Sequence, residues 1–137
     1  MSDLSTIVTV NIDVQTQSIA RTAFGIPAVL GQFAASKTTP AFSRTRVYTS
    51  IDEMVDEGWL TTDPVYKHVA SMFAQDPRPS TVVVGRRDSG DSTWATALAA
   101  IRAEDDSWYT FVFEPTSEGT TDAEIEEIGT WVLPQKK

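Results

Sequence analysis

Residues 85–92, Gly-Arg-Arg-Asp-Ser-Gly-Asp-Ser, have the glycine spacing of a loop that could bind phosphate. A phosphate-binding loop needs a lysine directly after its second glycine, to neutralise the β- and γ-phosphates, and then a hydroxyl for the magnesium ion. Here Asp91 follows Gly90, so a negative charge stands where the cation is required. Arg86 and Arg87 precede that position. We therefore interpret residues 85–92 as a turn between a strand and a helix.

His68 is the only histidine. It lies three residues after Val65 and four before Met72, so it borders the apolar stripe of a predicted helix. A general base needs an oriented partner and a pocket, and no serine, cysteine or carboxylate motif in the sequence identifies one. We interpret His68 as a packed or half-exposed helix residue.

The acidic run Glu104-Asp105-Asp106 lacks the Asp/Asn-Gly pattern of a calcium loop, and we interpret it as a helix end that enters a polar turn. The aromatic residues Trp94, Trp108, Tyr109, Phe111 and Phe113 are predicted to be core, with some of them covering an interface. No catalytic, cofactor-binding or metal-binding residue is therefore predicted. We expect a protein that is not an enzyme and needs no cofactor.

The composition is that of one ordinary domain. The chain has 137 residues, of which 41% are hydrophobic, and it has no cysteine, which excludes disulfides and cysteine-based zinc sites. No apolar run approaches the roughly 20 residues of a membrane helix, so no membrane insertion is expected. The start of the chain lacks the basic and apolar regions of a secretory signal.

The formal net charge of −8 is concentrated near the end of the chain. Residues 103–137 contain nine acidic residues and only two basic ones, Lys136 and Lys137. Such a segment repels polyphosphate, so no direct contact with nucleic acid is expected. It is either a solvated helix face or a surface that meets a basic patch on a neighbouring subunit. The candidate residues for a charge-complementary interface are Arg86, Arg87, Glu124, Glu126 and Glu127.

The elements that must position these residues are predicted from hydrophobic periodicity. Strands are expected at 26–31, where Pro27 suggests an edge position, and at 46–48, 82–84 and 108–113. Helices are expected after a capping box formed by Ser50 and Glu53 and ending at Gly58, from Asp63-Pro64, from Trp94, and over 122–133 with Ile125, Ile128 and Val132 inward. Residues 32–44 are expected to be loop. This order predicts an α/β fold in which helices pack on a layered sheet of parallel strands.

The first residues predict a separate strand. Val8, Val10, Ile12 and Val14 alternate with Ile7, Thr9, Asn11 and Asp13, and no charge occurs from Leu4 to Ile12. A terminal strand can pair within its own sheet or complete the sheet of another molecule, and both alternatives remain open from the pattern alone. We expect an N-terminal strand or arm at 1–20 and an α/β body at 21–137. The body would be truncated, since another strand is expected after the last helix.

Four segments resemble the beginning of the tail sheath proteins of contractile-tailed bacteriophages. They are "VTVNIDVQTQSIARTAFGIPAVLG", "RVYTSIDEMVDEG", "DPVYKHVASMFAQDPRPSTVVVGRR" and "WYTFVFEPTSEGTTDAEIEEIGTWV", which lie between residues 8 and 132. The resemblance lies in the order of these segments and in their residue patterns, and it includes no catalytic motif. Family members continue past the last helix into further strands and a C-terminal arm, which this chain lacks.

The resemblance implies a structural virion protein in the phage tail, assembled in the host cytoplasm. Its partners would be copies of itself in stacked hexameric rings joined by strand exchange, the tail tube protein, and baseplate and neck proteins. The interface residues of the arm would be Ile7, Val8, Val10, Ile12 and Val14. The alternatives are another tail or neck component, such as a tube, terminator or baseplate adaptor protein, and a small α/β nucleotide-binding module.

Overall fold

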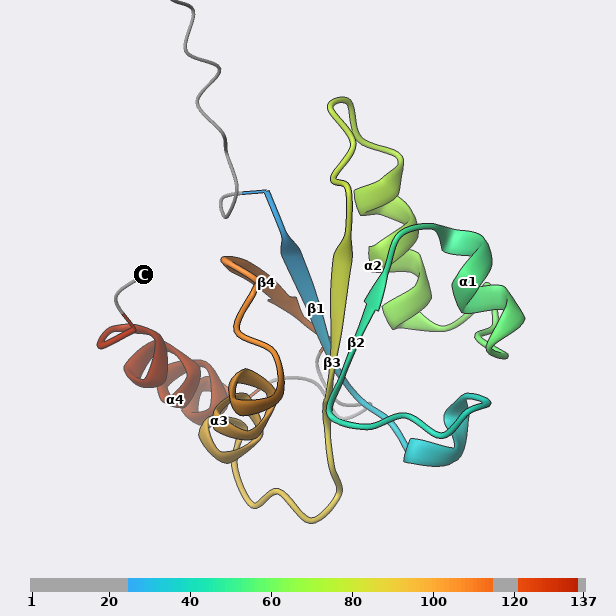
Figure 1. The fold of residues 1–137 in the computed structure, drawn as a ribbon. Coiled ribbons are helices and arrows are strands. Elements are labelled where there is room, and N and C mark those ends of the chain that lie inside the picture. Colours follow the sequence, from blue (N-terminus) through green and yellow to red (C-terminus); the bar gives the residue numbers. More distant parts are fainter. Residues whose placement is uncertain (1–24, 115–120, 136–137) are drawn as a thin grey trace, which may run out of the picture.

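A computed structural model describes residues 25–114 and 121–135, and these form a mixed α/β fold (Figure 1). The predicted N-terminal strand and arm, including Ile7, Val8, Val10, Ile12 and Val14, lies outside the described residues. The strands are β1 (Pro27–Gln32), β2 (Thr45–Tyr48), β3 (Val82–Arg87) and β4 (Thr110–Phe113). The α-helices are α1 (Ile51–Asp56), α2 (Pro64–Phe73), α3 (Trp94–Glu104) and α4 (Asp122–Val132), and a short 3-10 helix covers Ala35–Lys37.

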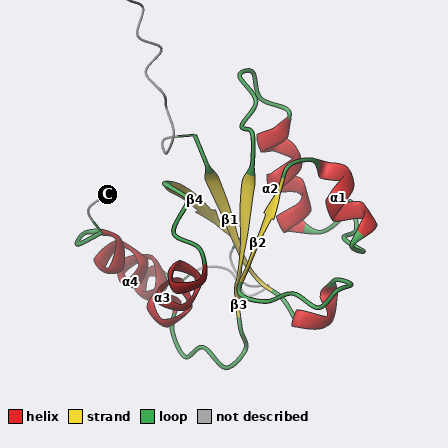
Figure 2. Cartoon of the chain, viewed as in Figure 1, coloured by secondary structure: helices red, strands yellow, loops and turns green. Residues whose placement is uncertain are grey.

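The four strands form one sheet in the order β2-β3-β1-β4. Strand β1 pairs in parallel with both β3 and β4, whereas β2 pairs antiparallel with β3. Helices α1 and α2 cover one face of the sheet, and α3 and α4 lie on the other face (Figures 1 and 2). The predicted layered α/β architecture is therefore confirmed for the described residues.

Each face of the sheet has its own hydrophobic core. On the side of α3 and α4, the core contains Ala28, Leu30, Val83, Trp94, Ala97, Leu98, Ile101, Trp108 and Ile128. On the side of α1 and α2, it contains Val29, Phe42, Tyr48, Met54, Trp59, Val65, Val69, Val82 and Val84. The three valines of β3 are fully buried, as a β-branched run covered on both faces predicts.

Two predictions about the sheet are wrong. Strand β1 lies between β3 and β4 and is not an edge strand. Proline is compatible with this position because Pro27 is the first residue of the strand, where its missing N–H removes no hydrogen bond from the interior of the sheet. The sheet is not all parallel, since β2 runs against β3. Two helices, α1 and α2, connect these strands. Each helix carries the chain from one end of the sheet to the other, so two helices return it to the end at which β2 finishes. Strand β3 then runs in the opposite direction to β2.

The helix starts are predicted correctly, but their polar contacts differ. Ser50 precedes α1 without a side-chain cap, and Glu53 instead accepts a hydrogen bond from the Thr49 N–H at 3.0 Å. Helix α1 ends before Gly58, whose φ of +100° suits glycine. Asp63 precedes α2 as predicted, and its carboxylate accepts from the Leu60 N–H at 2.7 Å. The predicted apolar stripe of α2 is confirmed.

The inward face of α4 is only partly as predicted. Ile128 is buried, but Ile125 is 52% exposed and Val132 is 41% exposed. The helix is rotated so that Glu124 and Glu127 turn toward the body of the protein. Glu124 accepts a hydrogen bond from Arg87, and Glu127 accepts one from the Ala95 N–H at the start of α3. In this orientation the two glutamates accept from donors of β3 and α3, while Ile128 and Trp131 of the same helix pack on the core.

Candidate functional site

The glycine-bounded segment is filled by its own side chains. Gly85, Arg86 and Arg87 belong to β3, and the turn itself follows them. The Asp91 carboxylate accepts hydrogen bonds from the Asp88 N–H and from the Arg44 guanidinium. The hydrogen bond from Arg44 is the main reason why the pKa of Asp91 lies below its ordinary value. Since loop carboxylates occupy these donors, the segment is the strand-to-helix turn that its sequence predicts.

The candidate charged interface residues mostly contact their own chain. Arg86 is buried, donates to the Ser43 carbonyl at 2.9 Å and forms an ion pair with Asp88 at 2.7 Å. Arg87 forms an ion pair with Glu124 at 3.2 Å, and its guanidinium lies 4.9 Å from the centre of the Trp94 ring. Glu127 binds the start of α3, whereas Glu126 is exposed. Four of these five side chains therefore contact their own chain, and the pair of Arg87 and Glu124 joins β3 to α4.

His68 has a partner that the sequence did not reveal. Its Nε2 lies 2.7 Å from a carboxylate oxygen of Glu114, the residue that follows β4. The histidine side chain is 41% exposed, which confirms a half-exposed helix residue. Glu114 also donates its N–H to the Leu30 carbonyl at 2.7 Å. The pair thus fastens α2 to the end of β4, and within the described ranges no serine or threonine hydroxyl is hydrogen-bonded to the ring.

The two edges of the sheet differ in how their backbone groups are satisfied. At the β2 edge, the Arg44 carbonyl accepts from the Arg86 N–H, so Thr45, Val47 and Thr49 direct their backbone groups outward. Glu104, at the end of α3, accepts from the Thr45 N–H at 2.9 Å. Side chains therefore already occupy part of this edge.

The remaining outward groups of the β2 edge are also partly covered. The Thr49 N–H donates to Glu53, and the Thr49 carbonyl accepts from Arg78 at 2.6 Å. Glu104 additionally accepts from the Ser43 hydroxyl at 2.8 Å. Burial alone would raise the pKa of Glu104, but the hydrogen bonds from residues 43–45 outweigh it and lower that pKa. Covering an edge with charged side chains is a known protection against strand addition, and β2 has it.

The β4 edge has no comparable cover among the described residues. Strand β4 is paired only with β1, so alternate N–H and C=O groups point away from the sheet. Eight large apolar residues are well exposed in the described parts of the chain. Five of them lie at β4 or at α4, and we call this set the β4 surface, although Val112 faces the side of the sheet opposite α4: Tyr109, Val112, Ile125, Val132 and Leu133. The other three, Val47, Val55 and Leu60, lie at or near β2 and α1.

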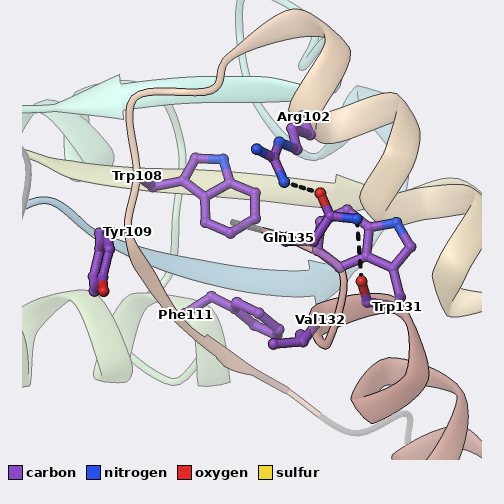
Figure 3. Close-up of a pocket in the computed structure, with 7 residues that line it drawn as sticks. All are labelled: Arg102, Trp108, Tyr109, Phe111, Trp131, Val132 and Gln135. Carbon is purple, nitrogen blue, oxygen red and sulfur yellow. Dashed lines mark hydrogen bonds between the residues drawn. The ribbon is translucent and has the colours of Figure 1, made fainter. Parts of the chain in front are cut away.

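An aromatic pocket lies between β4 and the last turns of α4 (Figure 3). Its volume is about 510 Å³. The indole rings of Trp108 and Trp131 are stacked with their centres 6.5 Å apart, and Phe111 meets Trp108 edge to face. The lining residues are Arg102, Trp108, Tyr109, Phe111, Trp131, Val132 and Gln135.

Only part of this pocket could be predicted from the sequence. Trp108 is buried and Phe111 packs on the core as predicted, whereas Tyr109, which is also predicted to be core, is 44% exposed. Trp131 is a pocket residue that was not predicted. It lies three residues after the buried Ile128, so helical spacing places both on one face and could have identified it.

The described residues include no helix long and apolar enough to cross a membrane. In the same ranges, no group of three or more histidine, cysteine, aspartate or glutamate residues is placed to hold a metal ion. Comparisons with protein-family models, with curated proteins and with solved structures give no match for this chain.

Proposed function

We propose that this protein is a structural subunit of a contractile phage tail sheath, which polymerises around the tail tube and contracts to deliver the genome. The proposal starts from the resemblance of four sequence segments to tail sheath proteins. It treats the protein as non-enzymatic, with copies of itself, the tail tube protein and baseplate and neck proteins as partners. Its location would be the virion.

The observation that carries the proposal is the difference between the two sheet edges. The β2 edge is partly covered by Glu104, Glu53 and Arg78, whereas among the described residues no side chain is hydrogen-bonded to the β4 edge, which lies beside exposed apolar side chains. A subunit with one open edge can accept a strand there without pairing at its other edge. Contacts of this kind are head-to-tail and propagate into rings or filaments.

The expected strength of such a contact is moderate. Each backbone hydrogen bond contributes about 0.5–1.5 kcal/mol net. Strand β4 has four residues, so its edge alone supplies a few such bonds. Stable assembly therefore also needs burial of the apolar side chains of the β4 surface, at about 25 cal/mol per Å².

Two exposed valines at opposite edges provide a matched test. Val112 in β4 is 41% exposed and Val47 in β2 is 47% exposed. The full-length protein and its Val112→Lys and Val47→Lys variants would be concentrated and examined by sedimentation velocity and negative-stain microscopy. We expect rings or tubes for the parent protein and for Val47→Lys, and loss of assembly for Val112→Lys, since a lysine on an edge strand opposes pairing.

A parent protein that stays monomeric at every concentration would reject self-assembly. Rings that never stack would favour a terminator or another ring-forming neck component over a sheath. Equal assembly of both valine variants would reject β4 as the assembling edge. Circular dichroism of each variant would establish that the fold is kept.

A further inference from the structure

Helix α4 carries apolar side chains on two different faces. On the inner face, Ile128 and Trp131 pack on the core. On the outer side, Ile125 is 52% exposed and Leu133, whose backbone is still helical, is 83% exposed. Gly129 lies midway between these two residues, and the spacing of four places all three along one face of the helix. Helix α4 packs against α3 and lies at the margin of the molecule in Figure 1.

The glycine in this outer face is not explained by its own chain. A glycine inside a helix costs about 1 kcal/mol relative to alanine. A Cβ added at Gly129 would meet no described part of the protein within 4 Å, so packing within the chain does not require a small residue there. A glycine does allow the backbone of another molecule to approach closely. The exposed position of Gly129 therefore points to a contact outside the chain.

We propose that the outer face of α4, defined by Ile125, Gly129 and Leu133, packs antiparallel against the same face of a second copy of this chain. The two helices would cross at Gly129. Ile125 of each copy then lies opposite Leu133 of the other, since both residues are four positions, or about 6 Å, from the crossing point. The pattern is thus self-complementary, as a contact about a two-fold axis requires.

The charges of α4 favour the antiparallel over the parallel arrangement. All acidic residues of the helix come before Ile128: Asp122, Glu124, Glu126 and Glu127. Residues 128–135 carry no charge. Parallel pairing would bring the two acidic halves together, whereas antiparallel pairing places each beside the uncharged half of the other helix. The chain continues with Lys136 and Lys137, whose charge is opposite to that of the helix start they would approach.

This contact differs in kind from the one proposed for the β4 edge. A contact about a two-fold axis closes on itself and gives a dimer, whereas head-to-tail contacts propagate. Val112 faces the side of the sheet opposite α4, so the variant Val112→Lys should lose rings and tubes and keep the dimer. The inference therefore goes beyond the proposed function and can be tested separately from it.

Cysteine cross-linking of the full chain tests the arrangement of the two helices. The chain has no cysteine, so Ile125→Cys and Leu133→Cys each carry a single thiol. Untagged Ile125→Cys would be mixed with tagged Leu133→Cys and oxidised in air. We expect the mixed disulfide to form several-fold faster than either like pair, because two copies of position 125 would lie about 12 Å apart along the helices, beyond the reach of a disulfide.

Tagged Leu60→Cys is the matched control, since Leu60 is 58% exposed and lies away from α4, after α1. It should cross-link poorly to Ile125→Cys. Faster linking of the like pairs would indicate parallel helices, and equal rates for Leu133→Cys and Leu60→Cys would indicate random collision. Either outcome would overturn the inference.

The variant Gly129→Gln tests the close approach of the helices. Glutamine forms helices better than glycine, and its side chain meets open space in its own chain, so the fold should be kept. Sedimentation velocity over a concentration series would be carried out in the Val112→Lys background. We expect a monomer–dimer equilibrium there, and Gly129→Gln should raise the concentration needed for the dimer about tenfold, because the two new side chains meet at the crossing point.

The control Leu60→Gln should leave the equilibrium unchanged. A background protein that is monomeric at every concentration, or a dimer that Gly129→Gln does not weaken, would overturn the inference. Rings or tubes of the parent protein without the disulfide between positions 125 and 133 would reject this docking and leave the proposed function standing. A dimer with that disulfide, from a parent protein that never forms rings or tubes, would reject the sheath and support the docking.

Discussion

Removing the Glu104 carboxylate should weaken the fold and also open the β2 edge. Glu104 accepts four hydrogen bonds from residues 43–45: from the Ser43 hydroxyl at 2.8 Å, the Thr45 N–H at 2.9 Å, the Thr45 hydroxyl at 3.0 Å and the Arg44 N–H at 3.4 Å. One side chain therefore connects the end of α3 to the start of β2. Glu104→Ala leaves all of these donors to water.

The magnitude follows from the number of bonds and their exposure. A hydrogen bond to a charged group contributes about 1.5–3 kcal/mol when it is buried, but these bonds are exposed and solvent screens them. We expect a total loss of about 1–2 kcal/mol in the free energy of unfolding. For a chain of this length, that lowers the melting temperature by roughly 3–8 °C.

The assay is thermal and urea unfolding followed by circular dichroism, with Asp106→Ala as the control. Asp106 lies just beyond the same helix end and forms an exposed ion pair with Arg102 at 2.9 Å. The loss of this exposed ion pair should contribute about 0.3–0.5 kcal/mol. Sedimentation velocity of Glu104→Ala should in addition reveal new association, since the freed Thr45 N–H extends the unpaired part of the β2 edge.

The pH dependence provides an independent check. The pKa of Glu104 is lower in the folded protein than in the unfolded chain, where its ordinary value is about 4.3. Its stabilisation is therefore complete above that value and is lost as the pH falls through the lower folded pKa. The difference between the parent and Glu104→Ala should be large at pH 7 and small near pH 3. A difference no larger than that of Asp106→Ala, or one that is unchanged at low pH, would refute this reasoning.

Two further predictions concern packing and charge. Gly85→Ala should destabilise the protein by about 1–3 kcal/mol, because the new Cβ would lie 2.5 Å from the Leu30 side chain. Gly129→Ala in α4, where a Cβ meets no atom, should instead stabilise it by about 0.5–1 kcal/mol. Urea unfolding measures both changes, and an unchanged stability for Gly85→Ala would contradict the packing at Leu30. Asp91→Asn should lower the free energy of unfolding by about 2–3 kcal/mol at pH 7, because the Arg44 guanidinium loses its charged partner. Folding lowers the pKa of Asp91, so this loss should shrink as the pH falls below about 3.9. A loss that persists at pH 2 would show that charge is not the cause.

The fold was largely predictable because its apolar patterns are local. A β-branched run, Val82-Val83-Val84, predicts a strand that is buried on both faces, and the burial of all three residues confirms it. Val65 and Val69 lie one helical turn apart and mark the inward stripe of α2. In each case the residue type and its spacing contain the information.

The contacts between elements could not be predicted in the same way. The capping-box pattern of Ser50 and Glu53 fits a helix start, but the Ser50 side chain makes no cap bond, and Glu53 accepts from the backbone of Thr49, one residue earlier. The pair of His68 and Glu114 joins residues 46 positions apart. Only the three-dimensional arrangement brings such groups together, and no periodicity records it.

The cover of the β2 edge is another long-range feature. Glu104 was interpreted only as part of an acidic helix end, and that description is correct for its place in the chain. Its role at Thr45, 59 residues away, depends on how α3 packs against the sheet. The cover of the β2 edge by Glu104 therefore becomes visible only with the fold.

The central position of β1 has a mechanical consequence. A pull on the chain before Pro27 enters the molecule through a strand that is bonded on both sides to parallel neighbours, β3 and β4. Such a force acts along the strand axis, so it loads both rows of hydrogen bonds in shear and many bonds must fail together. Had the same segment been an outer strand pulled sideways, its bonds would open one after another, as in a zipper. Force applied along β1 therefore meets more resistance than the same force would meet at either edge strand.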